Sequence, residues 1–263
     1  MSQKPIERLL GIMARLRDPE RGCPWDRAQD FRSIVPHTIE EAYEVAEAAE
    51  RDELVAMRDE LGDLLFQVVF LARLAEERGA FDFDAVATAI ADKLERRHPH
   101  VFGDVAFGSA AAQTAAWETQ KADERADRGL DGALDGVPAA LPALTRALKL
   151  GKRAARVGFD WPALAGAREK IDEEVGELDE ALQRGDAADI EHEIGDVLTA
   201  TANLARHAGV DPEQALRAAN RRFEDRFREV EAAVARDERA LGELTLDELE
   251  RYWQQAKKAL EQD

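Results

Sequence analysis

The sequence predicts an all-α protein made of two repeated, four-helix-bundle-like domains joined by a connector. Three observations support this prediction: a composition rich in helix-forming residues, apolar residues at helical spacing, and an internal duplication. Alanine, leucine, glutamate and arginine dominate the 263 residues, and aromatic residues contribute only 6%. β-Branched residues are sparse, so intrinsic propensity favours helices over strands.

The length of the chain suits two medium domains that each bury a hydrophobic core. We expect an N-terminal helical domain at residues 1–118, a connector at residues 119–150 and a C-terminal helical domain at residues 151–263.

Apolar residues recur at helical spacing in two groups of three segments. The first group covers residues 39–51, 54–77 and 83–97, and the second covers residues 165–184, 187–208 and 212–236. Glycine or proline interrupts the pattern between segments, as expected at helix ends. Between the two groups, residues 103–142 hold prolines and glycines that discourage a continuous helix, so we interpret this stretch as the connector.

The two groups are copies of one pattern, which is the strongest signal in the chain. Residues 40–44 read EEAYE and residues 60–63 read ELGD. At a separation of 133 positions, residues 173–177 read EEVGE and residues 193–196 read EIGD. No gap is needed to align these motifs, so a duplicated helical unit is predicted.

The repeated acids are spaced to converge. Residues three or four apart share one face of a helix, so Glu40 or Glu41 with Glu44 forms one acidic edge and Glu60 with Asp63 forms another. If the two helices pack antiparallel, four carboxylates meet, and their repulsion calls for a cation. Oxygen ligands of this kind favour Mg²⁺, with Mn²⁺ as an alternative. The alternative is that these acids only form solvated helix faces. That alternative would explain one such motif, but it does not explain why two motifs are repeated in fixed register.

A ferritin-like di-iron site is disfavoured because it requires a Glu-x-x-His pair on two helices. Here Glu60 and Glu193 are followed three residues later by Asp63 and Asp196. The five histidines do not repeat in register, so we expect structural or surface roles for them.

Basic residues follow the acids at matching places in the two copies. Lys93 and Arg97 are four residues apart, as are Arg222 and Arg226, and the two pairs are separated by 129 positions. The second copy therefore has a loop shorter by four residues, a change that loops tolerate. Such side chains suit the outer phosphates of a triphosphate. Ordinary surface charges at i, i+4 spacing are the alternative.

Composition excludes several function classes. The chain has 36 basic and 55 acidic residues and a net charge of -19, which disfavours nucleic acids and anionic membranes as partners. Its single cysteine, Cys23, has no in-register basic partner, so we expect a buried structural thiol in a reducing compartment. Neither a signal peptide nor a run approaching the ~20 apolar residues of a membrane helix is visible. We expect a cytoplasmic protein.

Longer motifs resemble those of the two-domain bacterial MazG family of nucleoside triphosphate pyrophosphohydrolases. Beside the doubled EExxE and ExxD motifs, the chain contains GCPWD at 22–26, LGDLLFQVVF at 61–70, DKLERRHPHVF at 92–102, VGFDW at 157–161 and NLARH at 203–207. The resemblance spans nearly the whole chain.

The resemblance implies metal-dependent hydrolysis of nucleoside triphosphates, NTP and dNTP, to the monophosphate and pyrophosphate, as nucleotide-pool housecleaning by a homodimer. It implies Mg²⁺ ligands, with Mn²⁺ as the alternative ion, at Glu174, Glu177, Glu193 and Asp196, and at their counterparts Glu41, Glu44, Glu60 and Asp63. The implied substrate contacts are Lys170, Arg222, Arg226 and Trp253, with Lys93 and Arg97 in the first copy.

Within this reading, Glu173 is the candidate general base and Glu193 a candidate catalytic ligand. Two positions depart from the family pattern: Arg222 stands where Lys is usual, and Asp189 stands where a Lys can occur. Trp253 either stacks on the base or anchors the last helix in the core. We weight the second copy as the more active one.

Two other functions stay open at this point. The first is a non-catalytic nucleotide-binding regulatory scaffold that has kept the fold and lost turnover. The second is a structural helical dimer with solvated acidic faces, which predicts no metal-dependent rise in melting temperature.

Overall fold

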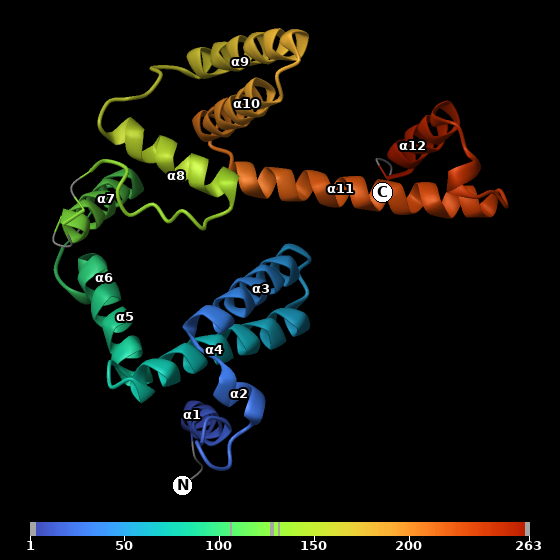
Figure 1. Cartoon of the computed structure of the whole chain (residues 1–263). Coiled ribbons are helices and arrows are strands. Elements are labelled where there is room, and N and C mark those ends of the chain that lie inside the picture. Colours follow the sequence, from blue (N-terminus) through green and yellow to red (C-terminus); the bar gives the residue numbers. More distant parts are fainter. Residues whose placement is uncertain (1–3, 106, 127–128, 131, 261–263) are drawn as a thin grey trace. The chain divides into compact units, whose positions relative to one another are not determined.

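The structure is a computed structural model that describes residues 4–105, 107–126, 129–130 and 132–260. Within these residues the chain forms helices and no strand, which confirms the all-α prediction (Figure 1). The chain divides into two compact units, Met1–Gln120 and Lys121–Asp263, and each is described by itself.

The first unit contains α1 (Pro5–Leu16), α2 (Pro24–Ala28), α3 (Phe31–Glu50), α4 (Leu54–Glu77), α5 (Phe83–Arg97) and α6 (Pro99–Phe102). Helix α7 (Ala110–Ala126) spans the division between the units. The second unit contains α8 (Ala143–Arg156), α9 (Leu164–Arg184), α10 (Ala187–His207), α11 (Pro212–Arg236), the short 3₁₀ helix η1 (Leu241–Glu243) and α12 (Leu246–Leu260).

An antiparallel hairpin of α3 and α4 forms the centre of the first unit. The Asp30 carboxylate accepts hydrogen bonds from the backbone N–H groups of Arg32 and Ser33, at 2.8 and 2.9 Å, and so caps the start of α3. Helix α1 packs across α4. Side chains of α1, α3 and α4 form the hydrophobic core, whose buried members are Met13, Ile34, Val69, Phe70 and Leu74.

A second hairpin, α9 and α10, forms the corresponding part of the second unit (Figure 1). Gly185 adopts a left-handed conformation with φ of 75° and ends α9, as is common after a helix. Asp186 caps α10 by accepting from the backbone N–H of Ala188 at 2.9 Å. Helix α8 packs against α10 and α11, and α12 packs against α11 around Val230, Val234 and Ala256.

The two hairpins place the repeated sequence motifs on equivalent helices. EEAYE lies on α3 and ELGD on α4, while EEVGE lies on α9 and EIGD on α10. Both hairpins also expose apolar side chains at positions 133 apart: Leu61 and Ile194 are 47% and 45% exposed, and Leu65 and Leu198 are exposed too. Each unit therefore presents a matching apolar face.

The structure differs from the sequence-based expectation in the region interpreted as connector. Helix α7 occupies residues 110–126, where a connector was expected. The sequence permits this helix because residues 109–128 contain neither proline nor glycine, and the prolines and glycines of the region lie before or after them. Helix α8 begins at Ala143, inside the range 119–150, and packs in the second unit. Among the described residues, none of the helices combines the length and the apolar character needed to cross a membrane.

Candidate functional site

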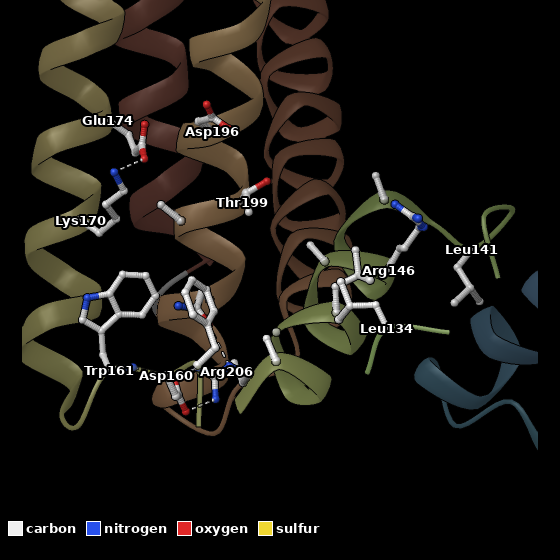
Figure 2. Close-up of a pocket in the computed structure, with 18 of the residues that line it drawn as sticks. Leu134, Leu141, Arg146, Asp160, Trp161, Lys170, Glu174, Asp196, Thr199 and Arg206 are labelled. Carbon is white, nitrogen blue, oxygen red and sulfur yellow. Dashed lines mark hydrogen bonds and ion pairs between the residues drawn. The ribbon is translucent and has the colours of Figure 1, made fainter. Parts of the chain in front are cut away.

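Three carboxylates meet between α9 and α10. Glu174 and Glu177 are one turn apart on α9, and both face Glu193 on α10, so that one carboxylate oxygen from each lies within 4.8 Å of the others. Glu174 is buried, at 6% exposure, whereas Glu177 is exposed. Asp196 lies one turn beyond Glu193 and, with Glu174, borders a neighbouring cavity (Figure 2).

Charge is only partly balanced in this cluster. Partial loss of hydration among its neighbours, followed by repulsion from Glu174 and Glu193, raises the pKa of Glu177 above its usual value. The Lys170 Nζ atom lies 2.7 Å from Glu173 and 2.8 Å from Glu174. These two carboxylates raise the pKa of Lys170 and keep it charged. One cation thus faces several anions.

The first unit repeats the cluster with Glu41, Glu44 and Glu60, whose carboxylate oxygens likewise lie within 4.8 Å of one another. Burial, then the charges of Asp63 and Glu44, raise the pKa of Glu41. Burial, then Glu44, raises the pKa of Glu60. Asp63 is therefore close enough to the cluster to act on it. The register-equivalent of Lys170 in this unit is His37, whose Nδ1 lies 3.5 Å from Glu40.

Both clusters fit a divalent cation by the chemistry of their donors. Every donor is a carboxylate oxygen, and the raised pKa values in each cluster come partly from unrelieved like-charge repulsion. Hard ions that accept oxygen ligands, such as Mg²⁺ and Mn²⁺, would relieve this repulsion.

A cavity of about 620 Å³ begins at the second cluster and continues between α8, α9 and α10. Figure 2 shows Lys170, Glu174 and Asp196 at one end, and Trp161 with Arg206 farther along. Trp161 and Asn203 both line the cavity, although the sequence predicted no role for either residue. The position of Asn203 could have been predicted from its spacing, because it follows Asp196 by seven residues and thus lies on the same face of α10.

Of the basic residues proposed as substrate contacts in the second unit, Lys170 lines the cavity, whereas Arg222 and Arg226 do not. On α11, the Arg226 guanidinium lies 6.0 Å from the Trp253 ring, which in turn lies 5.2 Å from Phe223. Trp253 is partly buried against the α11–α12 core. Within the described part of the second unit, the cavity lining includes neither of these two arginines.

In the first unit, Lys93 and Arg97 lie on α5. The Arg97 carbonyl accepts a hydrogen bond of 2.8 Å from the Trp117 indole N–H, which ties α5 to α7. Cys23 is partly buried and precedes α2, where its carbonyl accepts from the backbone N–H of Arg27.

Known proteins share the segments that carry both clusters. The family described as the MazG nucleotide pyrophosphohydrolase domain matches residues 29–102 and 166–230, so each match contains one acidic hairpin. The Escherichia coli (strain K12) nucleoside triphosphate pyrophosphohydrolase is 52% identical over 255 residues, which cover 96% of this chain and 97% of that protein. The Thermotoga maritima nucleoside triphosphate pyrophosphohydrolase/pyrophosphatase MazG is 43% identical, with 96% and 95% covered. The nucleoside triphosphate pyrophosphohydrolase of Mycolicibacterium smegmatis is 31% identical, over 95% of this chain and 71% of that protein.

Proposed function

Because the chain belongs to the MazG nucleotide pyrophosphohydrolase family, as its motifs indicated, we propose that it hydrolyses nucleoside triphosphates, both NTP and dNTP, to the monophosphate and pyrophosphate. The observation that carries the proposal is the carboxylate cluster of Glu174, Glu177 and Glu193, which borders a cavity large enough for a nucleotide. Removal of non-standard or surplus nucleotides from the pool is the role we propose for this reaction.

In this proposal, Glu174, Glu177, Glu193 and Asp196 hold Mg²⁺ or Mn²⁺. A bound ion would offset the charge of the phosphates and activate water for attack. Lys170, already charged beside Glu174, is placed to contact a phosphate once the metal shares that carboxylate. Its other partner, the exposed Glu173, would then be available as general base.

A homodimer is part of the proposal, because neither Arg222 nor Arg226 of the chain lines the described cavity beside the acids. A partner's α11 could supply these cations to the phosphates. The exposed apolar faces of the two hairpins, with Leu61 and Leu65 on one and Ile194 and Leu198 on the other, would be buried by such pairing.

The test is pyrophosphate release from NTPs and dNTPs with and without Mg²⁺. Turnover should need the metal, and Glu193→Ala should abolish it, whereas Glu60→Ala should spare it if the chemistry belongs to the second unit. Glu180→Ala is the matched control, since Glu180 is an exposed acid on α9 that pairs with Arg184 at 3.8 Å, outside the cluster.

A regulatory scaffold that binds nucleotides without turnover is the alternative. It would be favoured if folded wild-type protein bound nucleotide and released no pyrophosphate under any metal condition.

A further inference from the structure

We propose that the Lys170 ammonium competes with a divalent cation for the Glu174 carboxylate, so that the second acid cluster binds the cation more weakly than the first. The inference rests on the proposed function and extends it, because it gives Lys170 a role in metal binding besides its contact with phosphate. Substrate phosphates that attract Lys170 would release Glu174 to the cation. In the second unit, cation and substrate would therefore favour each other's binding.

Lys170 lies one turn before Glu174 on α9, and its ammonium contacts two carboxylates. The Lys170 Nζ atom lies 2.8 Å from a Glu174 oxygen, a pairing that Figure 2 shows. It also lies 2.7 Å from a Glu173 oxygen. Glu174 is one of the three acids whose carboxylate oxygens lie within 4.8 Å of one another. A divalent cation that binds this cluster therefore encounters a positive charge already paired with Glu174, and the two cations repel each other.

The surroundings of the ammonium make it hard to displace. Glu174 is buried, and breaking a buried ion pair is costly because it leaves one charge uncompensated. Hydrogen bonds to Glu173 and then Glu174 raise the pKa of Lys170 above its usual value, so the ammonium keeps its proton. Loss of hydration and the neighbouring acids raise the pKa of Glu177, and the charge of Lys170 opposes this increase. The ammonium thus acts on two acids of the cluster.

The first cluster has a histidine at the equivalent place. His37 stands 133 positions before Lys170, and its Nδ1 lies 3.5 Å from Glu40. No ion pair or hydrogen bond joins His37 to Glu41, the counterpart of Glu174, although the structure describes both side chains. An imidazole is also shorter than a lysine side chain and carries at most part of a positive charge near neutral pH.

A neutral amide contacts Glu41 instead. The Gln67 side chain is 7% exposed, and its Nε2 group donates to Glu41 over a long distance of 3.4 Å. Loss of hydration, and then the charges of Asp63 and Glu44, raise the pKa of Glu41. An amide can also turn to present its carbonyl oxygen to a cation, which an ammonium cannot do. The first cluster therefore offers a cation more uncompensated negative charge.

The two clusters should consequently acquire their cations under different conditions. The first would bind a divalent cation alone and would gain stability from it at low metal concentration. The second would bind its cation together with the phosphates that attract Lys170.

Mn²⁺ binding to the full chain without nucleotide, followed by electron paramagnetic resonance, tests the inference. Glu60→Ala removes an acid of the first cluster and so isolates the second, while Glu193→Ala isolates the first. In the Glu60→Ala protein, Lys170→Met should lower the Mn²⁺ Kd by about tenfold or more, because the competing charge is gone. In the Glu193→Ala protein, His37→Lys should raise the Kd by about tenfold or more for the opposite reason.

Arg168→Met in the Glu60→Ala protein is the matched control. It removes the same charge from the same helix, but Arg168 pairs with the exposed Asp172 rather than with an acid of the cluster. At physiological ionic strength it should change the Mn²⁺ Kd by less than about twofold, since exposed charges are screened. Circular dichroism checks the fold of each variant, and Lys170→Gln replaces Lys170→Met if the latter does not fold.

Three results would overturn the inference. They are an unchanged Mn²⁺ Kd on Lys170→Met, no Mn²⁺ binding to that variant, and a second cluster that binds Mn²⁺ in the Glu60→Ala protein at least as tightly as the first does in Glu193→Ala. Pyrophosphate release by wild type tests the proposed function separately. If wild type turns over and Lys170→Met leaves the Kd unchanged, the inference alone fails. If Lys170→Met tightens Mn²⁺ binding and wild type releases no pyrophosphate, the proposed function alone fails.

Discussion

Replacing Phe70 by alanine should destabilise the first unit by about 3–5 kcal/mol, the range found when a fully buried phenylalanine is truncated. Phe70 has 0% exposure and lies in one core cluster with Met13, Ile34 and Val69, so its ring cannot be replaced by solvent without loss of those contacts. The space that the ring leaves is also walled by Phe66. Partial collapse of this wall would place the loss at the lower end of the range.

Hydrogen exchange measured on peptides of α4 is the appropriate assay, since a chain of two units does not give one two-state unfolding free energy. At about 1.4 kcal/mol per tenfold change, protection in the first unit should fall between about a hundredfold and a few thousandfold, while α10 peptides stay protected. Val55→Ala, at an exposed position near the start of the same helix, is the control and should change protection by about threefold or less. A loss below about 1 kcal/mol, or one seen equally in α10, would refute the account of Phe70 as core.

Three further outcomes are expected. Hydrogen bonds from Arg206 and then His207, beyond the opposing effect of burial, lower the pKa of Asp160 to about 2, below that of the unfolded chain. This pairing should stabilise the second unit above pH ~4, and the stabilisation should be lost as pH falls toward 2. The melting temperature of Asp160→Asn should therefore change less than that of wild type as pH is lowered through this range. An equal change in the two proteins would contradict this account. Gly166→Ala should displace Trp161 and raise KM for NTPs severalfold with kcat less affected, and crystallographic density for an undisturbed indole would argue against this. Mg²⁺ at about a hundred times its Kd should stabilise wild type by about 2.7 kcal/mol per occupied site; Glu174→Ala with Glu41→Ala should remove the rise in melting temperature, and its persistence would locate the metal elsewhere.

The helices and both acid clusters could be predicted from the sequence because their information is local and repeated. Glu174 and Glu177 share a helix face by spacing alone, and the copy 133 positions earlier shows that the pattern is not an accident of a charged chain. A short loop then makes antiparallel packing of α9 and α10 the expected arrangement, which brings Glu193 to the other two.

The cavity could not be predicted in the same way. Its walls include Leu134 and Leu150, which lie within residues 119–150, where a connector was expected. Trp161 follows a loop with no periodic pattern to fix its path. Spacing shows that Arg222 and Arg226 share a face of α11, yet the direction in which that face points depends on tertiary packing. The pattern therefore could not show that neither arginine lines the cavity.

Helix α10 carries acids in its first half and cavity-lining residues in its second, and this division limits how its length can vary. Each inserted residue turns everything downstream by about 100° and shifts it by 1.5 Å. A single insertion between Asp196 and Asn203 would rotate the amide out of the cavity while leaving the acids untouched. A substitution on α10 would thus change one cavity side chain at a time. A change in the length of α10 would instead move every cavity side chain of its second half relative to the acids at once. The two copies agree with this: they differ at Thr199 and Phe66 but keep the same residue count through the hairpin, and the four-residue difference in length falls beyond it.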